Sequence, residues 1–205
     1  MMETEIQRYK KLNALAGREG IVIFGNKRDT LIPVGELRQA FSIEQKMYNR
    51  SFNDLSIADA IKVFDETIAP LSPESILIHL GDTDIDLFAG DSYLFDYHYR
   101  ALLNHIKSTK QNCRIAVVSL KNHHNDSQIT EINNHLKYIA ESEKCEYEDI
   151  SRPKVWNPQS TMNAISFVYS IGFVHPLKNK RPLHDLVRHF RLPVTNSYIE
   201  LFYVS

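Results

Sequence analysis

Several polar side chains that could bind a ligand or take part in catalysis stand just after apolar segments of this chain. They form three groups, which are Asn26 with Lys27, Asn53 with Asp54, and Asp82 with Thr83 and Asp84. Carboxylates and side-chain amides form hydrogen bonds, and lysine supplies a positive charge. Such residues could hold a small molecule if the fold brings them together. We treat the two asparagines, Asp82 and Asp84 as candidate substrate-binding residues.

The elements that must position these groups alternate between strand and helix patterns. Short apolar runs predict five strands, at residues 21–24, 45–49, 75–81, 114–120 and 145–150. Apolar residues at helical spacing predict helices between them, and an amphipathic helix at the start that packs Ile6, Tyr9, Leu12 and Leu15. This alternation predicts an α/β fold with a parallel sheet and helices on both faces. Ligands bind such sheets at the carboxyl ends of the strands, where the three groups are expected.

The composition points to one domain with a local binding site. The 205 residues carry 24 Lys and Arg against 25 Asp and Glu, so no excess charge attracts nucleic acid or an anionic membrane. We expect residues 1–205 to form a single domain. No apolar run approaches the roughly 20 residues that span a bilayer, and we expect a cytoplasmic protein. Cys113 and Cys145 lack a metal-binding spacing, which predicts buried reduced thiols, no metal and no cofactor.

Four segments, read together, resemble the SGNH hydrolases, also called GDSL-type, a family of esterases and acylhydrolases. The segments are IVIFGNKRDT, YNRSFNDLS, HLGDTDI and GFVH, and they match the family pattern at Asn49, Gly81, Asp84 and His175. The resemblance implies a flavodoxin-like three-layer α/β/α sandwich with a five-stranded parallel sheet. It also implies a site with a serine nucleophile, a histidine base, an aspartate that orients the histidine, and an oxyanion hole.

The chain departs from this pattern at the catalytic positions. Lys27 stands at the position of the serine, and Asn26 at that of the aspartate before it. Asp54 replaces the glycine of the oxyanion hole, and Thr83 replaces its asparagine. These departures leave the family mechanism without its nucleophile.

The late part of the chain is the least determined by its pattern. His175 matches the histidine base, but Gly172 stands in place of its aspartate, and His184 is a second candidate for the base. Residues 164–174 fit either a strand or a buried helix. Trp156 fits either a core position or the wall of a pocket.

The replacements predict that the serine-ester chemistry is lost. Lysine is protonated near neutral pH, and a protonated amine is not a nucleophile. The Asp54 carboxylate places negative charge where an oxyanion must form, and the Thr83 hydroxyl reaches less far than an amide. The resulting interpretation is a pseudoenzyme that binds a small molecule or a partner. In one hypothesis Lys27 forms a charged cluster with Asp54, Asp84 or both, and in the other it is a solvated loop lysine.

Two other functions stay open at this stage. An active hydrolase or acyltransferase would need His175 within reach of another hydroxyl, from Ser51, Ser92 or Thr83. A structural or assembly protein would show an exposed apolar patch.

Two further motifs fit helix starts and loops better than chemistry. The Gly-Asp-Ser at residues 90–92 follows the wrong strand to supply the family nucleophile, which predicts Asp91 or Ser92 as a helix cap. The neighbouring His123 and His124 fit a polar loop, with Asp126 or the serine after it starting the next helix.

Overall fold

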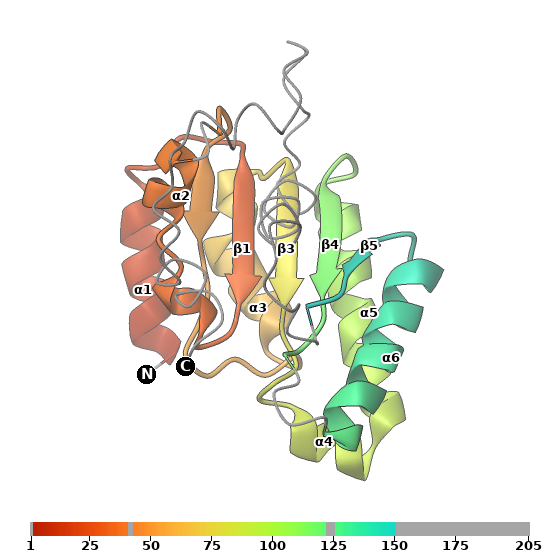
Figure 1. Ribbon diagram of the computed structural model, residues 1–205. Helices are drawn as coiled ribbons and strands as arrows, with labels where there is room; N and C mark the ends of the chain where they lie inside the picture. Colours follow the sequence, from red (N-terminus) through yellow and green to blue (C-terminus); the bar gives the residue numbers. More distant parts are fainter. Residues whose placement is uncertain (1, 41–42, 122–125, 151–205) are drawn as a thin grey trace, which may run out of the picture. The chain divides into compact units, whose positions relative to one another are not determined.

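The sheet of this protein has five strands that all run parallel. The computed structural model describes residues 2–40, 43–121 and 126–150. Within them the strands are β1 (Ile21–Gly25), β2 (Met47–Asn49), β3 (Ser75–His79), β4 (Arg114–Val118) and β5 (Glu146–Glu148). Their order is β2-β1-β3-β4-β5, and each neighbouring pair is parallel (Figure 1). The predicted α/β fold with a five-stranded parallel sheet is therefore confirmed.

Helices connect the strands, as the alternating pattern predicts. They are α1 (Met2–Asn13), α2 (Val34–Ala40), α3 (Ala60–Thr67), α4 (Ile85–Gly90), α5 (Ser92–Thr109) and α6 (Ser127–Ser142), with the 3-10 turns η1 (Asp29–Leu31) and η2 (Ala69–Leu71). The periodicity alone does not predict α4. Asp91 separates α4 from α5, and its carboxylate accepts a hydrogen bond from the Leu94 N–H at 2.9 Å. The predicted helix cap at the Gly-Asp-Ser motif is confirmed.

The start of α6 is capped in the same way. The Asp126 carboxylate accepts a hydrogen bond from the Gln128 N–H at 2.8 Å, which confirms the predicted helix start. His123 and His124 lie outside the described residues. The predictions for Trp156, Gly172, His175 and His184 fall in residues 151–205, which also lie outside the described residues.

The central strands are apolar on both faces because both faces are buried. Val22, Ile76 and Ile115 pair across the sheet on one face, and Leu77 and Ala116 pair on the other. Each of these side chains is at most 5% exposed. Full burial of one large apolar side chain contributes about 1.5–3 kcal/mol. This packing fixes the carboxyl ends of β1 and β3 beside each other.

Two predictions about the core need correction. Ile6 and Tyr9 of α1 are buried as predicted, but Leu12 is 45% exposed and Leu15 is 87% exposed. Because α1 ends at Asn13, Leu15 lies beyond the helix and does not continue its apolar face. The two cysteines are free thiols but are half-buried rather than fully buried. Burial still raises the pKa of the Cys113 thiol to about 12, so it is protonated at neutral pH.

The strand order reverses between β1 and β3, at the carboxyl edge of the sheet. From β1 the chain crosses to β2 on one side, and it then returns to β3 on the other side. Ligands bind open α/β sheets at such a reversal of strand order. The last residue pair across β1 and β3 is Gly25 with His79, so this pair marks the place to search for a site.

None of the helices in the described part of the chain combines the length and the hydrophobicity that a bilayer span requires.

Candidate functional site

Hydrogen bonds between side chains and backbone groups hold the turn that follows β1. The Asn26 amide oxygen accepts a hydrogen bond from the Arg28 N–H at 2.9 Å, and the Asn26 N–H donates to the Asp29 carboxylate at 2.8 Å. Asn26 is only 4% exposed. These bonds turn the chain directly from the strand into η1. Asn26 therefore shapes the turn through its amide oxygen and its backbone N–H, and its role in substrate binding stays a prediction.

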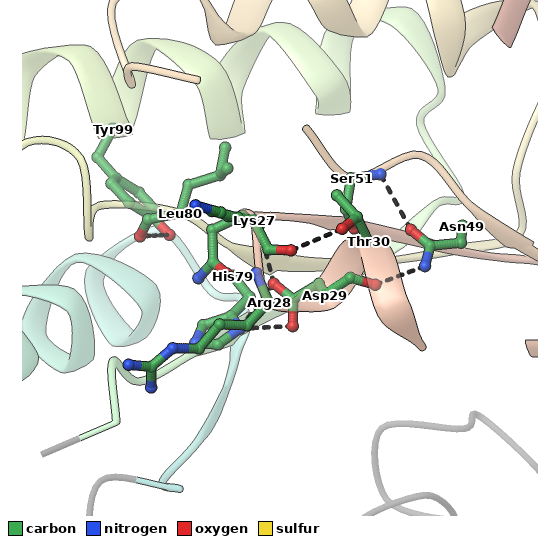
Figure 2. Close-up of polar contacts among 10 residues, drawn as sticks. Lys27, Arg28, Asp29, Thr30, Asn49, Ser51, His79, Leu80 and Tyr99 are labelled. Carbon is green, nitrogen blue, oxygen red and sulfur yellow. Dashed lines mark hydrogen bonds and ion pairs between the residues drawn. The ribbon is translucent and has the colours of Figure 1, made fainter. Parts of the chain in front are cut away.

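An aspartate and a histidine meet at the reversal of strand order. Asp29 comes from the turn after β1, and His79 is the last residue of β3. The His79 Nδ1 lies 2.9 Å from Asp29 Oδ2 and 3.1 Å from Oδ1 (Figure 2). The two side chains are 12% and 10% exposed. The sequence interpretation did not include either residue among its candidates.

Gly25 makes this contact possible. A Cβ atom at Gly25 would lie 2.1 Å from Asp29 Oδ2 and 2.6 Å from its Cγ, because the carboxylate lies directly over the glycine. Any larger residue at position 25 would push Asp29 away from His79.

The Asp29 charge controls the protonation of His79. Burial by itself lowers the pKa of His79, but the charge and hydrogen bond of Asp29, together with the charge of Asp82, outweigh it and raise the pKa. Arg28 has a smaller opposing effect. Burial raises the pKa of Asp82. The charge of His79 opposes this and lowers the pKa, and the Asp29 charge raises it by a smaller amount. Asp29, His79 and Asp82 thus form one electrostatically coupled group, which we call the Asp-His-Asp cluster.

The loop after β2 is fixed to the β1 turn. Asn49 donates from its amide to the Asp29 backbone carbonyl at 2.6 Å, and its amide oxygen accepts from the Ser51 N–H at 3.0 Å (Figure 2). The Ser51 side chain is 0% exposed, and its hydroxyl has no hydrogen-bond partner among the described residues. A substrate cannot reach this hydroxyl in the folded chain.

Asn53 is held by the first helix. Its side-chain amide and its backbone N–H both donate to Oε1 of the buried Glu5 in α1. Asp54 follows it and is exposed. The predicted substrate-binding role of Asn53 therefore competes with a structural bond that ties this loop to α1.

Polar side chains of the loop after β3 form hydrogen bonds with the backbone of the loop after β2. The Thr83 hydroxyl donates to the Leu55 carbonyl at 2.7 Å. The Asp84 carboxylate is 3% exposed and accepts from the Ile57 N–H, at 3.1 Å to each oxygen. Burial raises the pKa of Asp84, which the Ile57 and Thr83 hydrogen bonds partly counteract. Both residues fasten the β2 loop to the β3 loop.

Several solved structures are similar to this chain in fold. A GDSL-like lipase from Bacteroides thetaiotaomicron matches with a TM-score of 0.59 and 15% identity, over 75% of this chain and 81% of the lipase. The SGNH-family esterase AlinE4 matches with a TM-score of 0.51 and 13% identity, over 76% of this chain and 94% of the esterase.

This chain has the SGNH-hydrolase fold. An acetyl xylan esterase also matches, with a TM-score of 0.55 and 14% identity, over 65% of this chain and 77% of the esterase. No family profile and no curated protein sequence matches the chain. At these identities the likeness establishes the SGNH fold, and the chemistry has to be argued from this chain's own residues.

Lys27, which the sequence resemblance aligns with the serine of the family, has a solvent-exposed side chain. Within the described residues it makes no ion pair with Asp54 or Asp84. The Asp84 carboxylate instead binds the Ile57 N–H. The hypothesis of a Lys27 cluster with these carboxylates is therefore wrong, and the solvated lysine describes this residue.

The backbone pairing between β1 and β2 stops at Lys27. The Ile23 carbonyl accepts from the Arg50 N–H at 2.8 Å, and the Gly25 carbonyl accepts from the Phe52 N–H at 3.0 Å. The next pair in this series would join Lys27 and Asp54, but the Lys27 carbonyl accepts from the N–H and the hydroxyl of Thr30 instead. Within the described residues, the N–H groups of Lys27 and Asp54 are left without a hydrogen-bond partner.

The described residues contain no group of three His, Cys, Asp or Glu side chains arranged to hold a metal ion. The SGNH-type histidine predicted at His175 lies outside the described residues, so its place relative to this site stays a prediction.

Proposed function

We propose that this SGNH-like chain does not carry out the serine-ester reaction and instead binds a small molecule at the carboxyl edge of its sheet. In this view the family site persists as a binding site, and the chain is a pseudoenzyme. The alternative of an active hydrolase with another nucleophile requires a hydroxyl that can be reached and activated.

The state of the hydroxyls at this edge is the observation that carries the proposal. Thr30 donates its hydroxyl to the Lys27 carbonyl at 2.6 Å, and Thr83 donates to the Leu55 carbonyl at 2.7 Å. The Ser51 hydroxyl is fully buried. A hydroxyl that already donates to a carbonyl cannot pass its proton to a base without breaking that bond. None of these three hydroxyls is thus a ready replacement for the serine.

The unpaired N–H groups of Lys27 and Asp54 support a binding role. Both belong to the end of the β1 and β2 pairing, where each N–H can donate to an oxygen of a ligand. Backbone donors at the edge of a parallel sheet commonly fix the orientation of a bound small molecule. We therefore expect the ligand to present an acceptor oxygen, such as a carbonyl or a carboxylate, to these two groups.

The direct test is hydrolysis of short-chain p-nitrophenyl esters by the purified full chain. Wild type, Lys27→Ser, His175→Ala and a Lys27→Ala control are compared at equal concentration. The proposal expects no enzyme-dependent turnover by wild type or Lys27→Ala. Turnover by wild type that His175→Ala abolishes would establish an active hydrolase and overturn the proposal.

A further inference from the structure

The exposed face of α5 is uncharged, unlike that of its neighbour α6. The exposed positions of α5 are occupied by Tyr93, Leu94, Tyr97, Asn104, Ser108 and Thr109. The exposed positions of α6 include three charged residues, Glu131, Lys137 and Glu141. A helix face that stays in water normally carries charged residues. The face of α5 is therefore typical of a surface that a partner covers.

The large side chains of this face form a continuous strip. Tyr93 and Tyr97 are four residues apart, so they lie on the same side of α5. Arg100 follows three residues later, and its guanidinium lies over the ring of Tyr138 in α6, at 5.4 Å from the ring centre. Because α5 and α6 lie side by side, the strip runs from one helix onto the other (Figure 1). We call Tyr93, Tyr97, Arg100 and Tyr138 the tyrosine strip.

The tyrosine strip exposes a large apolar area. Its three tyrosines are 87%, 66% and 64% exposed in chain order. One aromatic side chain covers about 150–250 Å², so together they present roughly 300–550 Å². A stable protein interface buries about 800 Å² on each partner, and the strip supplies about half of that before its neighbours are counted. Tyrosine and arginine are also the residue types that contribute most to binding at the centre of interfaces.

The charges beside the strip are paired within the chain. Arg100 lies 3.0 Å from the Glu143 carboxylate, and the Asp96 carboxylate lies 2.9 Å from His135 Nδ1. In a two-fold interface, each group near the axis meets its own copy, so an unpaired charge there would repel itself. The internal pairs prevent this repulsion, and the whole chain has a formal net charge of only −1. The strip therefore suits a second copy of this chain better than a charged partner.

The sizes of the side chains along α5 fit an antiparallel pairing of two copies. When two such helices cross at a two-fold axis at Tyr97, the residue four positions before it meets the residue four positions after it. Tyr93 of one copy then lies over Ala101 of the other, which is small and half-buried. A large side chain opposite a small one lets the two helices interdigitate.

We propose that the protein forms a two-fold symmetric dimer through the tyrosine strip, with the two α5 helices antiparallel. This inference goes beyond the proposed function and does not depend on it, because the strip contains no residue of the candidate site.

Sedimentation velocity of the purified full chain over a series of concentrations is the test. Tyr97→Glu and Tyr97→Lys are measured separately and as an equimolar mixture, because the two-fold axis places position 97 of one copy against position 97 of the other. Leu15→Glu is the matched control, since Leu15 is as exposed as Tyr93 but lies beyond the end of α1. Circular dichroism establishes that each variant is folded.

The proposal expects wild type and Leu15→Glu to form a species of twice the mass of one chain as the concentration rises. It expects the dissociation constant to rise at least tenfold in each Tyr97 variant and to fall again in the mixture, where glutamate faces lysine. A wild-type chain that stays monomeric at every concentration would overturn it. So would a dimer that both Tyr97 variants leave unchanged, a mixture that stays as monomeric as its components, or an equal loss in Leu15→Glu.

Discussion

The Asp29 carboxylate and the His79 imidazole join the end of β1 to the end of β3, with His79 Nδ1 at 2.9 Å from Asp29 Oδ2. They are 50 residues apart in the chain and meet at the reversal of strand order. The contact exists because Gly25 leaves room for the carboxylate. This relationship gives the site its geometry and its charge, and most of the predictions below alter it.

Gly25→Ala should destabilise the protein by about 1–3 kcal/mol, because the new methyl group would overlap the Asp29 side chain and break its bond to His79. Gly35→Ala in α2 is the matched control, since no atom lies within 4 Å of the added Cβ there. Its stability should be unchanged or higher by up to about 1 kcal/mol. Urea unfolding followed by circular dichroism measures both. Equal stability of the two variants would show that Asp29 does not lie over Gly25 in solution.

Asp29→Asn should lower the pKa of His79. The Asp29 charge is what overcomes the effect of burial, so burial would dominate once that charge is removed. Titration of the His79 Cε1 proton by NMR measures the change, with Asp86→Asn as the exposed control. An unchanged His79 pKa in Asp29→Asn would contradict the coupling between the two residues.

The same pair should make stability fall as pH rises. The pKa of His79 is higher in the folded chain than the ordinary value near 6.5, so its contribution is fully present below about pH 6.5 and is lost as the pH passes through the folded value. The difference in unfolding free energy between wild type and Asp29→Asn should therefore shrink at higher pH. Urea unfolding at several pH values measures it, and a difference that grows with pH would have the wrong sign.

Asp84→Ala should destabilise the fold by about 1–3 kcal/mol, because it leaves the Ile57 N–H without its acceptor. Asp86→Ala, on the exposed side of the same turn, should change stability little. Equal effects in urea unfolding would mean that Asp84 does not fasten the two loops.

The fold could be predicted from the sequence because it follows from local patterns of apolar residues. Short apolar strands such as 21–25 and 75–79 alternate with amphipathic helices, and this pattern specifies a buried parallel sheet. The same pattern correctly places Lys27, Asp54 and Asp82 at the carboxyl ends of strands. It does not predict α4, because six residues are too few to reveal a period.

The contacts within the site could not be predicted in the same way. His79 ends an apolar strand and matches no motif, and Asp29 gains its role only when the turn after β1 folds back over Gly25. The expected ion pair between Lys27 and Asp84 does not form, because the Asp84 carboxylate accepts a hydrogen bond from the Ile57 N–H instead. The only signal in the sequence was a histidine two residues before Gly81, at the end of a predicted central strand.

The central claim is that the carboxyl edge has lost its nucleophilic hydroxyl. The most direct measurement is incubation of the full chain with a fluorophosphonate, which reacts with activated serines, followed by intact-mass analysis and peptide mapping. The account predicts an unmodified wild-type mass under conditions that fully label an active SGNH esterase. A stoichiometric adduct on a serine or threonine, lost when His175 is changed to Ala, would contradict it.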